Sequence, residues 1–358
     1  MLFFGTKVNS GELPKNVKIL QRSQANNMEG LFKIDKINGK GYGWIALQDI
    51  KAGTVIYQEK NQIVLGSKTE DHLLDMMTSF YAMTENDQKQ FLELHNKYLD
   101  LNSLPDSQKK WYFDIKNNAE VIQTIQKLGL DFNLALKIIC IYKTNAFKWG
   151  VGIKVSRMNH SCCPNSQTEN WNGCDMAIRA IRATSKILEG QEITICYLDP
   201  LKNFKERQEF CHMRGFVCSC EVCQDEEINK DDKTYEKFQN LKEEVESIIK
   251  QPSNPGFPLL EKALAHQKQM YNLAKKKKVP KSFIYDILKK ALEIGFSGYC
   301  VAFNQKNHGK MKYFKGECQN LSKVGLQIAK MVLGQENTRL KEWKEITQDF
   351  DNWIKKKI

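Results

Sequence analysis

The densest group of chemically reactive residues in the sequence is a run of three cysteines, Cys218, Cys220 and Cys223. Thiolates are preferred ligands of Zn²⁺, and three of them within six residues can bind one tetrahedral ion. The fourth ligand must come from another part of the chain. The candidates are Cys162, Cys163, Cys211 and His212. The alternative interpretation is a group of buried or redox-active thiols without a metal.

Three further motifs place polar or aromatic side chains where they could form a binding site. They are KGYGW at residues 40–44, RMNHSCCPN at 157–165 and EITICYL at 192–198. Taken singly, they read as a hairpin turn, a turn with satisfied polar side chains and a core strand. The glycines of the first motif do not extend to G-x-G-x-x-G, so a dinucleotide site of the Rossmann type is excluded.

Hydrophobic periodicity divides the chain into elements that must position these motifs. Residues 31–66 and 150–198 alternate apolar and polar side chains between glycines, which predicts strands, including VGIKVSRM, MAIRAIRA and EITICYL in the second segment. Residues 69–142 show helical spacing. A short polar helix is expected between residue 201 and the cysteines, and helices follow from Asp231 with an interruption at 251–260. The second β segment must therefore pair with the first across a helical insert.

The net charge of +12 belongs to one part of the chain. Residues 251–358 contain 21 basic and 9 acidic side chains, whereas residues 1–250 contain 33 of each. This asymmetry indicates two modules with different surfaces. The basic module could bind an acidic partner, such as nucleic acid or an acidic peptide. The alternative is a solvated lysine-rich surface, and such a module would not attract a Lys-rich histone tail unless the groove were locally acidic.

Composition also limits the class of protein. Hydrophobic residues make up 41% of the chain, which excludes wholesale disorder. No apolar run is long enough for a transmembrane helix, and the opening residues lack the basic region of a secretory signal. Eleven cysteines without an export signal favour reduced thiols or metal ligands over disulfides. We therefore expect a monomer of the cytoplasm, the nucleus or both, with no membrane association.

Together and in this order, the four motifs resemble those of SET-domain protein lysine methyltransferases, over roughly residues 30–225, and most closely the SET and MYND-domain (SMYD) family. The resemblance implies an α+β fold: a β-clip of small sheets with a pseudoknot, a helical insert, a post-SET zinc site and an all-α, tetratricopeptide-like C-terminal domain. It implies the following division: an N-terminal SET segment at 1–66, the insert at 67–144, a C-terminal SET segment at 145–200, the zinc module at 201–230 and the helical domain at 231–358.

The chain departs from the SMYD pattern in two places. Residues 45–139 contain no cysteine and only two histidines, so the MYND zinc finger is expected to be absent. Arg214 and Gly215 precede Phe216 where relatives often supply a second channel tyrosine. This leaves open the substrate channel, the target lysine and the number of methyl groups added.

The resemblance also implies ligands and site residues. S-adenosylmethionine (SAM) would be bound by Lys40, Gly41, Tyr42, Asn145, Asn159, His160, Tyr197 and Phe216. Tyr197 would also line the methyl-transfer pore as the catalytic residue. A structural Zn²⁺ would be held by Cys162, Cys218, Cys220 and Cys223.

The implied function is SAM-dependent protein lysine N-methylation of a histone or non-histone substrate, with direct transfer to a neutral lysine amine. Two alternatives remain. One is a non-catalytic SET scaffold that binds SAM and zinc, which Arg214 suggests. The other is a zinc protein that binds nucleic acid through its basic helices.

Overall fold

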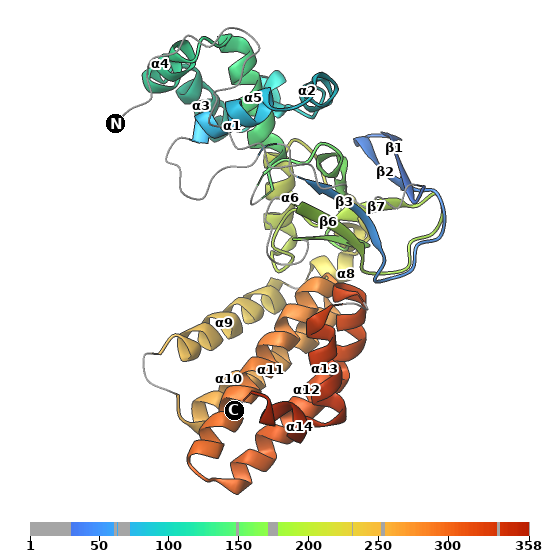
Figure 1. Ribbon diagram of the computed structural model, residues 1–358, viewed down its shortest axis with the longest axis vertical. Helices are drawn as coiled ribbons and strands as arrows, with labels where there is room; N and C mark the ends of the chain where they lie inside the picture. Colours follow the sequence, from blue (N-terminus) through green and yellow to red (C-terminus); the bar gives the residue numbers. More distant parts are fainter. Residues whose placement is uncertain are drawn as a thin grey trace.

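The computed structural model describes residues 30–60, 63, 72–147, 150–170, 178–230, 232–251, 255–334 and 337–357. These residues form three tiers, with short helices at one end, small sheets in the middle and long helices at the other end (Figure 1). The expected α+β class is confirmed. Residues 1–29, which open the predicted segment 1–66, lie outside the described residues, as do the first two residues of the run MAIRAIRA.

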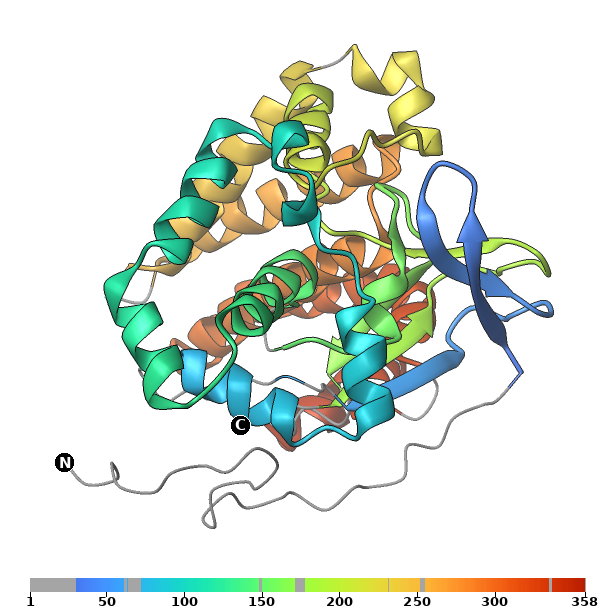
Figure 2. The same cartoon turned by 90° about the horizontal axis from the view of Figure 1, so that it is seen from above.

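Two small sheets form the middle tier. One has the strand order β1-β2-β7-β4 and the other β3-β6-β5. The strands are β1 (Phe32–Ile37), β2 (Gly41–Ala46), β3 (Val55–Lys60), β4 (Asn159–His160), β5 (Ser166–Asn170), β6 (Ile178–Ala183) and β7 (Glu192–Ile195). Each sheet combines strands from before and after the insert, so the predicted pairing of the two β segments is confirmed. Seen from above, the β1–β2 hairpin lies on one side of the molecule and the insert helices on the other (Figure 2).

The prediction of a strand at residues 151–158 is wrong. The segment turns into a short 3₁₀ helix, η3 (Val155–Arg157), because a buried carboxylate captures its backbone. The two side-chain oxygens of Glu59 accept hydrogen bonds from the N–H groups of Lys154 and Val155, both at 3.0 Å. Alternating hydrophobicity cannot reveal this interaction, since its acceptor lies about 95 residues earlier in the chain.

The insert is helical, as predicted. Its elements are α1 (His72–Tyr81), α2 (Glu85–Leu92), η1 (Lys97–Leu99), η2 (Leu101–Ser103), α3 (Asp106–Lys116), α4 (Ala119–Lys127) and α5 (Phe132–Asn145). Side chains of Thr84, Asn118 and Asp131 cap α2, α4 and α5 by accepting from the backbone of the first turn. Such caps supply partners for N–H groups that a helix leaves unpaired.

Helices also make up the rest of the chain. The cysteine module, residues 201–230, contains α6 (Phe204–Met213), α7 (Glu221–Gln224) and α8 (Glu226–Asn229). The C-terminal helices are α9 (Asp232–Ile249), α10 (Phe257–Lys276), α11 (Lys281–Asn304), α12 (His308–Leu333), α13 (Thr338–Gln348) and α14 (Phe350–Lys355). None of the described helices combines the length and apolar character needed for a membrane span.

Glycines let the C-terminal helices pack closely. A Cβ added at Gly298 would lie 2.4 Å from the ring of Phe314, and one at Gly325 would lie 2.0 Å from the ring of Trp343. Since such distances are impossible, α11 requires glycine where the Phe314 ring packs on it, and α12 requires glycine where the Trp343 ring packs on it.

A buried arginine seats the end of α12 on the second sheet. Arg182 of β6 donates from Nη2 to Glu169 at 2.6 Å and from Nη1 to the carbonyl of Gly53 at 2.7 Å. A Cβ at Gly334, which ends α12, would lie 2.2 Å from Nη1 of Arg182. The side chain of Gln167 in β5 adds a 2.8 Å hydrogen bond to the carbonyl of Val332. The end of α12 thus packs on Arg182 and is joined to the sheet by the hydrogen bond from Gln167.

A glycine substitution tests the backbone capture described above. A Cβ at Gly152 would lie 2.5 Å from an oxygen of Glu59, whose position its two backbone hydrogen bonds hold. We expect Gly152→Ala to lower the free energy of unfolding by about 1–3 kcal/mol in chemical denaturation, because the buried contact cannot relax freely.

The control is Gly316→Ala in α12, where an added Cβ meets nothing within 4 Å. Alanine favours a helix interior over glycine by about 0.5–1 kcal/mol, so this variant should be more stable. Equal effects of the two substitutions would contradict the proposed contact.

Candidate functional site

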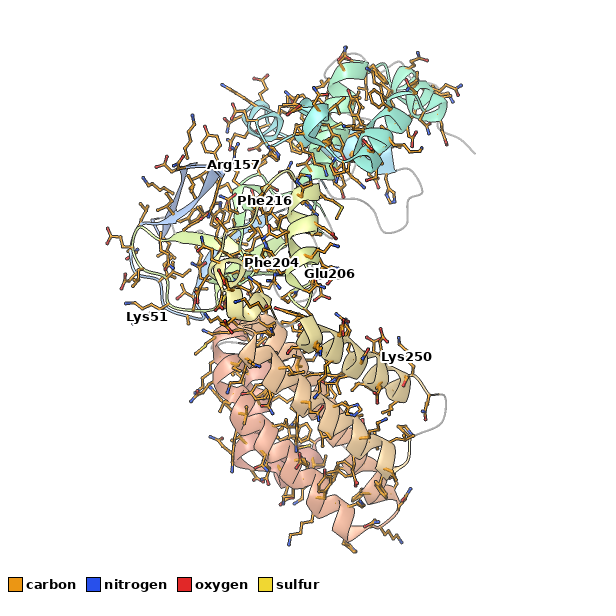
Figure 3. The ribbon with its side chains drawn as sticks, turned by 180° about the vertical axis from the view of Figure 1, so that it is seen from behind. Lys51, Arg157, Phe204, Glu206, Phe216 and Lys250 are labelled. Atoms are coloured by element: carbon orange, nitrogen blue, oxygen red, sulfur yellow. The ribbon has the colours of Figure 1, made fainter. Side chains whose placement is uncertain are left out.

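One cavity of about 1500 Å³ lies where the insert, the first sheet, the cysteine module and the C-terminal helices meet. Every residue that the sequence assigned to SAM binding lines this cavity: Lys40, Gly41, Tyr42, Asn145, Asn159, His160, Tyr197 and Phe216. Arg157 and Phe216 lie in the middle tier, toward the insert (Figure 3). The structure therefore brings together side chains that are up to 176 positions apart in the sequence.

Parallel pairing of β4 with β7 forms the centre of the cavity wall. The register sets Asn159 opposite Thr194 and His160 opposite Ile195. Just beyond β7, the backbone N–H of Tyr197 donates to Nδ1 of His160 at 3.0 Å. Because Nδ1 accepts this hydrogen bond, the ring proton must lie on Nε2, which points to the sulfur of Cys162 at 3.3 Å. The histidine thus links the tyrosine strand to the cysteines.

Tyr197 is held at both ends. Its hydroxyl donates to the carbonyl oxygen of Met158 in a short hydrogen bond. Burial raises the pKa of this phenol well above its usual range, so it stays a neutral donor. Phe216 meets the Tyr197 ring edge-on at 6.2 Å, and the His160 ring lies 5.9 Å from Phe216. These three rings form an aromatic wall.

The KGYGW motif at residues 40–44 brings the backbone of β2 against the aromatic wall. Nδ2 of Asn159 donates to the carbonyl of Tyr42 at 3.2 Å and to Glu192 at 2.9 Å. A Cβ at Gly43 would lie 2.7 Å from the same Nδ2, so only glycine allows β2 to approach. Gly41 has φ of +74°, a conformation that glycine adopts without strain.

Cations from two segments lie at this edge. Nζ of Lys40 is 2.7 Å from a carboxylate oxygen of Glu192. The guanidinium of Arg157 lies over the Tyr42 ring at 5.3 Å and 3.9 Å from a carboxylate oxygen of Glu93 in the insert. Lys40 therefore shares its charge with Glu192, and Arg157 is a second cation available to an anionic ligand group.

The cysteines converge beside this wall. The sulfur atoms of Cys162, Cys218, Cys220 and Cys223 all lie within 4.8 Å of one another. Cys162 is 3.6 Å from Cys223 and 4.0 Å from Cys218. A tetrahedron of thiolates with Zn–S bonds of ~2.3 Å has sulfur–sulfur edges of about 3.8 Å. The donor set and its spacing fit one zinc ion without rearrangement.

The other candidates for a fourth ligand are placed differently. Cys211 belongs to a second group with His160 and Cys218, whereas Cys163 and His212 belong to neither of the groups found in the described chain. Nε2 of His160 is directed at Cys162. The geometry therefore favours Cys162.

A buried arginine supports the cysteine module. Arg207 of α6 is only 1% exposed, and its Nε has no hydrogen-bond partner among the described residues. Its Nη2 donates to Asn229 at 2.8 Å, and Asn229 donates in turn to the carbonyl of Cys223 at 2.9 Å. A zinc ion with four thiolates carries a net charge of −2, which this guanidinium would partly balance.

Comparison with known proteins agrees with the geometry. Residues 41–198 match the SET domain family. The chain contains a SET domain. It is 28% identical over 201 residues to Histone-lysine N-methyltransferase set5 of Schizosaccharomyces pombe, covering 55% of this chain and 51% of that protein. It is 35% identical over 145 residues to Histone-lysine N-methyltransferase SMYD3 of Mus musculus, covering 37% of this chain and 32% of that protein.

The chain thus spans about half of the first relative and a third of the second. A crystal structure of the SET domain of LSMT bound to lysine and AdoHcy aligns with a TM-score of 0.39 and 12% identity, covering 93% of this chain and 95% of that one. This similarity is too low to support an argument about this chain.

Two cavity residues connect the end of α5 to the segments around it. Nδ2 of Asn145, at the end of α5, donates to the carbonyls of Ile141 and His95, which ties the insert to the cavity rim. Arg214 donates from Nη1 to the carbonyl of Thr144 at 3.3 Å, and its guanidinium lies 5.3 Å from the Phe210 ring. A cation therefore lines the cavity where relatives often have a tyrosine.

Sequence reasoning missed several residues that line the SET-domain cavity. Glu192 was read only as part of a strand, although it binds both Lys40 and Asn159. His95 and its neighbours in the insert have no motif that could reveal them. Lys275 and Lys281 belong to a lysine-rich stretch whose position in space the sequence did not indicate.

Metal analysis tests the cysteine cluster. We expect the purified protein to contain about one equivalent of zinc by elemental analysis, and Cys162→Ser to lose it, since serine is a poor ligand for this site. The control is Cys163→Ser, which changes the next residue but not the cluster. Equal zinc content in both variants would contradict the assignment.

Proposed function

We propose that this protein is a SAM-dependent protein lysine N-methyltransferase. The observation that supports this most strongly is the single cavity in which the glycine hairpin, Asn159, His160, Tyr197 and Phe216 meet. The relatives set5 and SMYD3, which are named histone-lysine N-methyltransferases, support the same reaction. The substrate would be a lysine of a histone or of a non-histone protein.

The cavity fits the methyl donor by its chemistry. Aromatic rings of Tyr42 and Phe216 can cover apolar parts of the ligand, and the cations Lys40 and Arg157 can face its carboxylate. Asn145 and the backbone around Asn159 supply further polar partners. When bound, SAM would supply an electrophilic methyl group on a sulfonium.

The protein must also deliver a neutral lysine amine. At pH 7, deprotonating a lysine of pKa ~10.4 costs about 4.6 kcal/mol. The aromatic wall disfavours the ammonium form by excluding water, and the guanidinium of Arg214 disfavours it by charge repulsion. The Tyr197 hydroxyl and the Met158 carbonyl can orient the amine.

None of the carboxylates in the described lining is free to accept the proton. Its carboxylates are Glu93, Glu192 and Glu221. Each has a cationic neighbour, at 3.9 Å for Arg157, 2.7 Å for Lys40 and 2.7 Å for Lys278 respectively. We therefore propose that the proton leaves to water and that positioning provides most of the catalysis.

Zinc would have a structural role in this scheme. The four cysteines leave no open position for water, so the ion would hold the cysteine module against the cavity. This keeps Phe216 and Arg214 in place, since both precede Cys218 closely. We also propose the division of the chain at residues 66, 144, 200 and 230.

A non-catalytic SET scaffold is the second candidate. The observation that favours it is Arg214, whose charge lies in the channel wall and could repel a substrate lysine. The complete Asn159–His160–Tyr197 arrangement argues against it. The two candidates differ in whether methyl groups are transferred.

Substitution of the tyrosine separates these candidates. We expect Tyr197→Phe to lower methyl transfer from radiolabelled SAM to lysate proteins by roughly 100-fold, as for loss of one oriented hydrogen-bond donor. Binding of SAM by calorimetry should persist. The control is Tyr285→Phe in α11, which removes a buried hydroxyl without a hydrogen-bond partner among the described residues. A wild-type protein that binds SAM but labels nothing would establish the scaffold.

The pH dependence tests the requirement for a neutral amine. We expect kcat/KM to rise about tenfold per pH unit between pH 6 and 8, because the neutral fraction of a lysine with pKa ~10.4 rises by that factor. Burial raises the pKa of Tyr197, so its ionisation should cause no decline in this range. A profile without slope would contradict rate control by amine deprotonation.

A further inference from the structure

Three lysines of the C-terminal helices line the same cavity as Tyr197. Lys275 lies in the last turn of α10, Lys278 in the connection and Lys281 at the start of α11. We refer to these three residues as the lysine wall. Lysines commonly occur in the last turn of a helix, because they complement its dipole. The helix dipole explains the position of Lys275 in its helix. It does not explain why all three lysines line the cavity that contains Tyr197.

The charges that line the cavity do not cancel. Its three carboxylates, Glu93, Glu192 and Glu221, each have a cation nearby, as described above. The cations left over are Arg214, Lys275 and Lys281. No carboxylate of the described residues lies within ion-pair distance of these three.

Their present contacts are weak or neutral. The ammonium of Lys275 lies over the Tyr271 ring at 5.5 Å, and Lys281 donates to the carbonyl of Thr184 at 3.0 Å. An anionic partner in the cavity could therefore gain from both charges without displacing an internal ion pair.

The lysine wall continues into a second, smaller hollow. Lys278 lines both cavities, and the second, of about 700 Å³, is bordered by more lysines than acids. Its lysines are Lys230, Lys233, Lys276, Lys277 and Lys278, and its acids are Asp225 and Glu227. Lysine side chains thus continue outward from the reactive cavity along the junction between the cysteine module and α10.

We propose that the lysine wall binds acidic residues that flank the target lysine of a protein substrate. This rests on the proposed function, because a lysine that reaches Tyr197 brings its neighbours in the chain past the wall. A nucleic acid is the less suitable partner, since most of its contacts are phosphate contacts on open surfaces, whereas these lysines line a recess. The lysine wall would therefore select acidic over basic flanking sequences by charge complementarity.

Matched peptides test this selection. Each peptide carries one central lysine flanked by Asp and Glu, by Ser and Gly, or by Arg. We expect kcat/KM for the acidic peptide to exceed that of the neutral one by about fivefold or more at low salt, as for two exposed charge pairs. Fluorescence anisotropy without SAM should give the same order of affinities, and 0.5 M salt should reduce the difference.

Charge reversal connects the preference to the wall. The double variant Lys275→Glu, Lys281→Glu should lose the preference for acidic flanks in both measurements. Lys275→Gln, Lys281→Gln provides the milder variant if the first does not fold, and zinc content with thermal stability reports on folding. The control, Lys312→Glu, Lys323→Glu, changes two exposed lysines of α12 and should keep the preference.

Several outcomes would overturn the inference while leaving methyl transfer intact. One is equal or better use of the Arg-flanked peptide by the wild type. Another is an unchanged preference in the wall variants. A third is tighter binding of a duplex DNA oligonucleotide than of the acidic peptide, lost in the same variants. If SAM binds but neither these peptides nor lysate proteins accept methyl groups, the proposed function itself fails.

Discussion

The parallel pairing of β4 with β7 is the interaction on which the site depends. Two residues of β4 are enough to align His160 with the residue after β7, so that the imidazole receives the N–H of Tyr197. These strands are separated by residues 161–191, and β4 is the shortest strand of the described chain. A shift of one residue in this register would move Asn159 and His160 each to the face opposite its present one.

The imidazole of His160 contacts both the tyrosine strand and the cysteine cluster. One nitrogen of His160 orients the tyrosine strand, and the other donates to a cysteine sulfur of the cluster. The cysteine cluster and the cavity therefore share a side chain and are not merely neighbours. Arg207 adds a buried positive charge that is linked to the carbonyl of Cys223 through Asn229.

Much of the site could be predicted because its residues occur in short motifs. The residues named for SAM binding all line one cavity, and the cysteine cluster gathers the four thiols expected, although their roles remain predictions. The alternation of β and helical periodicities indicated two β segments around a helical insert, and the resemblance implied the α+β class. The wrong strand prediction and the overlooked site residue both depend on contacts between distant segments. Glu59 turns residues 151–158 away from a strand, and Glu192 acts through its partners Lys40 and Asn159. Periodicity records burial along one segment, so it carries no information about such partners.

The charge asymmetry shows the same limit. The basic excess of residues 251–358 was evident from composition, and a solvated surface was a sufficient explanation. Only the fold shows that the end of α10 and the start of α11 border the cavity, so that part of this charge lines it. Composition thus identified the sign of the excess charge, and the fold determined which surfaces carry it.

The seating of α12 on Arg182 has a consequence for how ionic strength acts on this protein. The Arg182–Glu169 pair is largely removed from solvent, and Arg182 also donates to the backbone carbonyl of Gly53, so dissolved ions screen these contacts little. Added electrolyte would therefore weaken the proposed attraction between the lysine wall and a charged peptide but leave the contact of α12 with the second sheet unchanged. Capture of a substrate and the architecture that receives it would respond separately to the ionic environment.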